Sequence, residues 1–243
     1  MTRILKYEMQ RLLVNKFYLF FFAVNVFFAW YVLTSDIIAG VAYTAPFSQW
    51  SYGTYLSSLM PMMIMTVLFL LTSFYAKNEK RVELLTKATS VNVIGHTMIR
   101  MGVVLLAFII LLVPVIGISV YFYSSFFGFN DYADFLLPAA ATVLPGLIFF
   151  LGAGFWAGSI HIGFLYALIL VSLLLNFPVI PGAFDIFGKG YYSGYPAMQN
   201  LPLTADGEPL FVLTPAFFVS RLVYMVAGAA LFIFSILRLN RVK

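Results

Sequence analysis

The side chains that could carry out catalysis are few, and their spacing does not suit it. The 243 residues include 2 histidines and no cysteine, so a thiolate nucleophile and a thiolate metal site are excluded. Ser159 precedes His161 by two positions within a predicted turn, which is too local for the nucleophile and general base of a hydrolase. We therefore expect no catalytic residue, no metal site and no enzymatic activity. An intramembrane enzyme is kept as an alternative, to be tested with Ser159→Ala and His161→Ala.

A phosphate-binding loop is not expected either. Gly182–Gly190 approaches the pattern of such a loop, but five residues separate Gly182 from Gly188, and glycine follows Lys189. The motif requires four intervening residues and a Ser or Thr after the lysine, because that hydroxyl holds the magnesium ion. We therefore expect the chain to bind no cofactor and to hydrolyse no ATP by itself.

The elements that hold these residues are predominantly apolar. The chain is 63% hydrophobic and 9% charged, which leaves too little polar material for a separate soluble domain of ordinary size. Six apolar segments come near the ~20 residues that span a bilayer as a helix. They are Phe17–Thr34, Thr54–Tyr75, Met101–Tyr123, Leu136–Trp156, Ile162–Asn176 and Pro215–Leu237. The expected fold class is an all-α integral membrane protein with six transmembrane helices in a single domain, residues 1–243.

The basic residues indicate the orientation of the chain. Of the 14 Lys and Arg residues, 12 fall in residues 1–16, Lys77–Arg100 and Arg238–Lys243. Six crossings place these three stretches on one side, which the positive-inside rule identifies as the cytoplasm. We therefore expect both termini in the cytoplasm, and expect the charge of +5 to face lipid headgroups rather than nucleic acid. The apolar spacing within residues 1–16 predicts an amphipathic helix in the membrane interface.

Three polar or polarisable features lie inside the spans. Asn25 at mid-depth is interpreted as a hydrogen-bonding contact between helices or as a contact to a transported substrate. Met62 belongs to a methionine cluster around Pro61, which either fills the packing or adapts to an apolar cargo. Arg221 is interpreted as an anchor that pairs with a loop carboxylate such as Asp206 or Glu208, or as an outer gate.

Two connections carry further predictions. Within residues 77–100, Glu79–Ala88 is expected to form a short amphipathic helix with Val82 and Leu85 on one face. Such a helix is able to dock into a groove of a soluble partner, although a solvated basic loop is the alternative. Residues 177–214 contain several prolines and aromatic residues and are expected to form an ordered cap with short helices outside the membrane.

The whole chain resembles the type-2 permease family of ATP-binding cassette exporters. The diagnostic stretch runs from Phe74 to Thr86 and has an aromatic end to the second span, then Glu and Arg, then a leucine pair. The family usually has a proline-containing turn after the pair, and here Ala88–Val91 stands in its place. The resemblance implies a plasma-membrane exporter of amphipathic cargo such as a peptide or a lipid-like molecule.

The resemblance also implies partners and site residues. Two permease subunits, identical or different, pair in the lipid bilayer, and each binds a cytoplasmic ATPase subunit that uses ATP and magnesium. The residues implied to transmit ATPase motion are Glu79, Arg81, Glu83, Leu84 and Leu85. The first, second and fifth spans are implied to line the route, with Asn25, Met62 and Asn176 as candidate lining residues.

The main alternative is a membrane scaffold or immunity protein that binds a peptide or lipid without a motor. Co-purification with an ATPase distinguishes the two functions.

Overall fold

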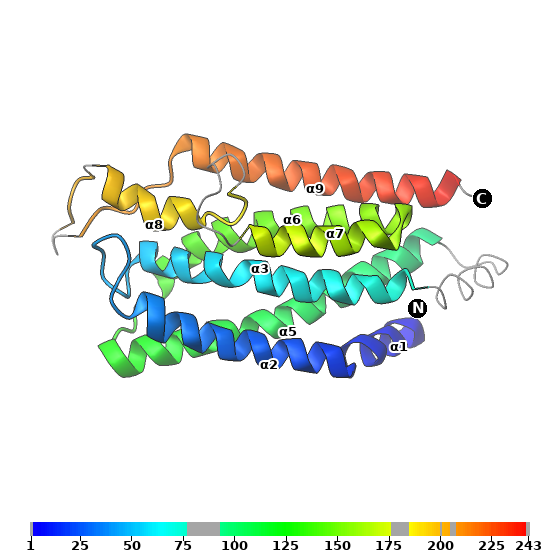
Figure 1. The fold of residues 1–243 in the computed structure, drawn as a ribbon, viewed down its shortest axis with the longest axis horizontal. Coiled ribbons are helices and arrows are strands. Elements are labelled where there is room, and N and C mark those ends of the chain that lie inside the picture. Colours follow the sequence, from blue (N-terminus) through cyan, green and yellow to red (C-terminus); the bar gives the residue numbers. More distant parts are fainter. Residues whose placement is uncertain (1, 77–92, 176–184, 200, 205–207, 242–243) are drawn as a thin grey trace.

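The helices of the protein form an elongated bundle in the computed structural model, which describes residues 2–76, 93–175, 185–199, 201–204 and 208–241 (Figure 1). The helices are α1 (Thr2–Leu13), α2 (Lys16–Val32), α3 (Gln49–Phe74), α5 (Val93–Phe127), α6 (Leu136–Ile160), α7 (Ile162–Leu174), α8 (Lys189–Met198) and α9 (Pro215–Arg241), with a π-helical turn η1 (Leu33–Ile37) and a 3-10 turn η2 (Ala133–Phe135). The described residues contain no β-strand, only an isolated bridge between Leu203 and Pro209. The all-α prediction is confirmed for this part of the chain.

Five helical stretches are long and apolar enough to cross a membrane, and the protein is therefore treated as membrane-embedded. They are Lys16–Ile37, Gln49–Phe74, Ile94–Phe127, Ala133–Ile160 and Pro215–Arg238. The expected fifth span, Ile162–Asn176, is instead represented by α7, whose 13 residues extend only about 20 Å. That length is shorter than the ~30 Å hydrocarbon core of a bilayer. Asn176 lies outside the described residues.

The start of α5 corrects the expected limits of the 77–100 loop. The helix begins at Val93 rather than at Met101, so residues 93–100 belong to it. A helix can extend beyond the hydrocarbon core of the bilayer. The residues before Met101 are helical here because they pack against α1. The rest of the expected coupling loop, residues 77–92, lies outside the described part of the chain.

Side-chain caps set several helix boundaries. The Asn15 side chain accepts a hydrogen bond from Phe17 N at 3.0 Å and separates α1 from α2. Ser48 caps α3 by accepting from Ser51 N at 3.1 Å. His161 has extended backbone angles between α6 and α7, and its Nδ1 accepts from Gly163 N at 3.0 Å. The reversal therefore falls within the predicted turn at Gly158–His161.

Helix α3 is the most enclosed of the candidate spans. In its most apolar stretch 78% of the residues are buried, whereas the share in α9 is 17%. It packs against α2, α5, α6, α7 and α8, and Figure 1 shows it running through the middle of the bundle. The exposed side chains of α9 are mostly apolar, as expected for a helix whose outer face contacts lipid.

Glycines allow α6 and α9 to approach each other closely. A Cβ atom at Gly152 would lie 1.9 Å from the carbonyl oxygen of Gly228, and a Cβ at Gly228 would lie 2.4 Å from that of Ile148. Gly154 and Gly158 of the same helix have a different partner. These two glycines face side chains of Leu71 and Tyr75 at the end of α3, so α6 uses glycines on two sides.

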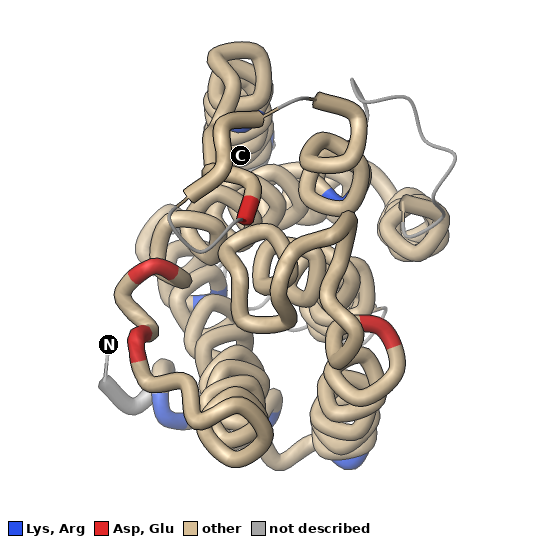
Figure 2. The backbone as a smooth tube through the Cα atoms, turned by 90° about the vertical axis from the view of Figure 1, so that its left-hand side faces the viewer, with Lys and Arg blue, Asp and Glu red and all other residues tan. Residues whose placement is uncertain are grey.

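Charge is distributed unevenly between the two ends of the bundle. The end that contains η1, η2 and α8 carries most of the described carboxylates, and Figure 2 looks onto this end. These carboxylates are Asp36, Asp131, Asp134, Asp185 and Glu208. The opposite end holds α1, the starts of α2 and α5 and the last turns of α9 (Figure 1), with Lys6, Arg11, Lys16, Arg100 and Arg238.

Candidate functional site

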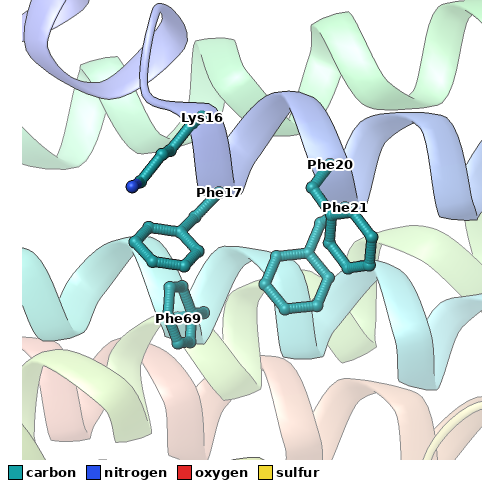
Figure 3. Close-up of a pocket in the computed structure, with 5 residues that line it drawn as sticks. All are labelled: Lys16, Phe17, Phe20, Phe21 and Phe69. Atoms are coloured by element: carbon teal, nitrogen blue, oxygen red, sulfur yellow. The ribbon is translucent and has the colours of Figure 1, made fainter.

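An open groove lies between α2 and α3 at the end of the bundle that contains α1. It has a volume of about 600 Å³ and is lined by Lys16, Phe17, Phe20 and Phe21 of α2 and by Phe69 of α3. The ring centroids of Phe17 and Phe21 lie 5.7 and 5.3 Å from that of Phe69. Figure 3 shows these rings in a row, with Lys16 at one end beside Phe17. The groove therefore offers a long apolar surface that ends at a positive charge.

Asn25 and Met62 are linked on the same pair of helices. Asn25 Nδ2 donates to Phe21 O at 2.8 Å and to Thr66 Oγ1 at 3.0 Å. Thr66 Oγ1 in turn donates to Met62 O at 2.9 Å. Asn25 Oδ1 is buried and accepts no hydrogen bond from the described residues. The amide thus joins α2 to α3, as one of its two predicted roles requires, while one acceptor is left for a further donor.

The side chain of Met62 lies on the part of α3 that is not completely covered. Most of α3 is buried, but Met62, Met65, Phe69 and Ser73 are partly exposed, and their spacing of three and four residues places them on one helical face. Phe69 of this stripe forms the wall of the groove. The stripe and the groove together can accommodate an apolar chain, because thioethers and aromatic rings pack adaptably against such groups.

A buried carboxylate connects α1 with α5 at the same end. The side chain of Glu8 is 3% exposed, and its Oε2 lies 3.4 Å from Arg11 Nη2. Arg100 Nε donates to Glu8 Oε1 at 3.4 Å, and His96 Nε2 lies 4.0 Å from the same oxygen. A carboxylate this enclosed requires positive partners, since an unpaired buried charge is costly. Glu8 therefore fixes α1 to the first turns of α5.

The two arginines also contact the end of α3. The guanidinium carbons of Arg11 and Arg100 lie 5.4 and 4.9 Å from the centre of the Phe74 ring, which is the geometry of cation–π attraction. We call Glu8, Arg11, Phe74, His96 and Arg100 the basal clasp. It joins the last residue of α3 to the start of α5, and so brackets the predicted coupling segment. Glu79, Arg81, Glu83, Leu84 and Leu85 themselves lie outside the described residues.

No family model, no curated protein and no solved structure matches this chain. The function is therefore inferred from its own residues.

Removal of the Glu8 carboxylate is expected to loosen the basal clasp. Glu8→Gln removes the negative charge that faces Arg11 and Arg100 and costs about 1.5–3 kcal/mol of stability, because hydrogen bonds to charged groups contribute that much. We expect a melting temperature about 2–4 °C lower for each kcal/mol lost, measured on the purified protein in lipid nanodiscs. Gln10→Ala, an exposed position of the same helix, should melt like the wild type. Equal melting temperatures for Glu8→Gln and the wild type would contradict the structural role.

Arg221 acts as an anchor between α9 and the segment before α8. Its Nη1 donates to Asp185 O at 2.7 Å and also to Ile186 O. The guanidinium carbon lies 4.1 Å from the centre of the Phe217 ring. Glu208, one of the two expected partners, instead accepts from Ala45 N at 3.0 Å; the other, Asp206, is outside the described residues. The arginine is buried and therefore does not extend outward to water.

Asp185 organises the helix above this anchor. Its two carboxylate oxygens accept from the backbone nitrogens of Gly188, Lys189, Gly190 and Tyr191 at 2.8–3.2 Å, which caps the start of α8. Gly188 has a φ of 84°, a conformation that glycine adopts without the Cβ strain of other residues. The predicted cap in residues 177–214 thus includes a real helix in its described part.

Aromatic side chains attach α8 to the bundle. Tyr191 and Phe217 are stacked with centroids 4.1 Å apart, and Trp50 Nε1 donates to Pro209 O at 3.2 Å. Thr142 Oγ1 donates to the Tyr192 hydroxyl at 3.2 Å. Burial raises the pKa of Tyr192 to about 12, so the hydroxyl is neutral at physiological pH. These contacts close this end of the bundle over α3.

Ser159 and His161 have local structural partners. Ser159 Oγ donates to Trp156 O at 2.7 Å, and His161 caps α7 through Nδ1. Each side chain bonds to a backbone group at a helix end, and neither orients the other. Their geometry therefore gives no support to the intramembrane-enzyme alternative.

Sequence reasoning missed the basal clasp and most of the groove. The sequence places Lys16 in a basic stretch and Phe17 at the start of an apolar segment. It does not show the groove, because the groove depends on how α2 packs against α3. A weaker signal was present for the clasp. Glu8 is the single acidic residue among the first sixteen, and a lone carboxylate on a basic helix often has a specific partner.

Proposed function

We propose that this chain is the membrane-spanning subunit of an ATP-driven exporter for an amphipathic cargo. The observation that carries the proposal is the groove between α2 and α3, which combines phenylalanine rings with one terminal lysine. Such a lining matches a molecule with an apolar body and a charged end. The resemblance to type-2 permeases supports the same function, since it implies that the first and second spans line the route.

The basal clasp supports a mechanical connection to a motor. It joins α1, the end of α3 and the start of α5 at the two ends of the segment 77–92. A force applied to Glu79, Arg81, Glu83, Leu84 or Leu85 by an ATPase subunit would be passed to these helices together. We propose that ATP and magnesium are bound by that partner, and that two permease subunits assemble around the route.

The topology of the proposed exporter has six crossings with both termini in the cytoplasm of a plasma-membrane protein. Helix α7 starts at the end of the bundle that contains α1, and α8 lies at the opposite end (Figure 1), so we place α7 within the fifth crossing. The excess of basic residues around α1 supports this orientation under the positive-inside rule.

The coupling segment gives the sharpest test of the motor. The chain should be co-expressed with an ATP-binding cassette ATPase that co-purifies with it, and the complex reconstituted in lipid nanodiscs. We expect the double variant Glu83→Ala, Leu85→Ala to lower ATP hydrolysis at least tenfold, equivalent to about 1.4 kcal/mol, because the docking contact is lost. Expression and melting temperature of the permease should not change.

Thr89→Ala provides a control in the same segment, outside the proposed contact. Undiminished hydrolysis by the double variant would sink the coupling assignment. If no ATPase co-purifies and the isolated chain still binds a peptide or lipid, the motor-independent scaffold or immunity protein is the better description.

A further inference from the structure

We propose that the groove between α2 and α3 is a binding site for an anionic phospholipid of the surrounding bilayer. The phosphate lies at Lys16, and one acyl chain lies along Phe17, Phe20, Phe21 and Phe69. This site does not depend on ATP-driven export and would exist equally in a scaffold protein.

The shape of the groove suits an acyl chain. Its volume of about 600 Å³ falls within the ~300–1,000 Å³ of small-molecule sites. Phe17 and Phe20 are 49% and 62% exposed, so the rings are accessible from the side of the bundle. The rings of Phe21 and Phe69 contact each other across the groove, with centroids 5.3 Å apart. A chain lying here covers aromatic surface that α2 and α3 leave uncovered.

The location of the groove selects a membrane component as its occupant. Both walls belong to helices long and apolar enough to cross a bilayer, so a component of the bilayer can enter the open side of the groove. Lys16 is the first residue of α2, and therefore lies where that helix enters the membrane. A lysine at this depth reaches the headgroup layer with its ammonium group.

Charge complementarity favours an anionic headgroup over a zwitterionic one. The Lys16 ammonium lies 5.5 Å from the centre of the Phe17 ring, and no described carboxylate lines the groove. Glu8, the described acid at this end, is buried and faces Arg11 and Arg100. Exposed Lys6 belongs to the same end of the bundle and adds to its positive potential. A basic residue near the membrane surface attracts anionic lipid.

The test measures lipid retention rather than transport. The purified full-length chain is exchanged into detergent containing equal amounts of phosphatidylglycerol and phosphatidylcholine, and bound lipid is counted by native mass spectrometry. We expect about fivefold preference for phosphatidylglycerol, the factor that one interfacial lysine supplies. Lys16→Gln should remove this preference, and Phe20→Ala should reduce retention of both lipids.

Arg238→Gln is the matched control, because Arg238 is exposed at the same end of the bundle but does not line the groove. It should keep the preference. The proposal is overturned if the wild type retains the two lipids equally, if Lys16→Gln keeps the preference, or if Arg238→Gln loses it to the same extent. Since Phe20 is largely exposed, Phe20→Ala should fold, and unchanged retention by this variant would also overturn the site. None of these outcomes depends on an ATPase.

Discussion

Replacement of Gly228 by valine is expected to prevent the protein from folding. A Cβ at this position would lie 2.4 Å from Ile148 O and 2.6 Å from Phe149 Cα. It would clash with the backbone of α6, and no side-chain rotation relieves such a clash. Helix α9 packs chiefly against α6 within the described structure, and separating the two helices removes most of its contacts. We expect a loss of about 4 kcal/mol or more, above the ~1–3 kcal/mol of ordinary overpacking.

The measurement is the yield of monodisperse protein in detergent by size-exclusion chromatography, together with its melting temperature. Gly117→Val and Gly102→Val are matched controls, because a Cβ at either glycine of α5 meets no described atom within 4 Å. Both should give normal yields. A Gly228→Val protein that elutes and melts like these controls would show that the two helices do not pack as described.

Replacement of Arg221 by methionine is expected to release α8 from the bundle. Methionine fills a similar volume but donates no hydrogen bond, so the carbonyls of Asp185 and Ile186 lose their charged donor. The stacking on Phe217 is lost as well. Unsatisfied buried acceptors cost about 1–3 kcal/mol each, and we expect a total near 3 kcal/mol, seen as a lower melting temperature.

Limited proteolysis locates this effect. Cleavage within residues 185–213 should accelerate in Arg221→Met, since their attachment to α9 is weakened. Arg238→Met makes the same chemical change at an exposed position of α9 and should leave both measurements unchanged. Proteolysis of Arg221→Met at the wild-type rate would mean that the aromatic contacts alone hold α8.

Hydropathy alone predicts most of the long helices but not their limits. Helix α3 begins at Gln49, before the predicted Thr54, because Trp50, Ser51 and Tyr52 are buried under other elements. A hydropathy scale scores such residues as polar or neutral. Trp50 packs against Tyr191 and Tyr195 of α8, whereas Tyr52 packs against Tyr123 and Phe135, so their burial depends on elements far along the chain. The short length of α7 has no counterpart in the sequence, which remains apolar up to Asn176.

In the candidate site, too, the sequence predicts some contacts and not others. The embedded position of Asn25 predicts a hydrogen bond between helices, and the structure supplies Thr66 as the partner. For Arg221 the sequence suggests a carboxylate, whereas the guanidinium binds backbone carbonyls. Every residue has a backbone carbonyl, so the residue types in the sequence do not indicate which carbonyls Arg221 binds. Likewise Glu8 and Arg100 are 92 positions apart, and only the fold brings them together.

The enclosure of α3 has a consequence for how the chain is made. Synthesis produces α3 before α5, α6, α7 and α8, which supply most of its covering. Until they arrive, Thr54, Ser57 and Ser58 of α3 face either lipid or the insertion machinery. Their hydroxyls bond within α3 itself where the structure gives partners, as from Thr54 to Trp50 O and from Ser57 to Thr54 O. These hydrogen bonds lower the free-energy cost of exposing the hydroxyls to hydrocarbon. They therefore allow α3 to enter the membrane before the later helices are synthesised.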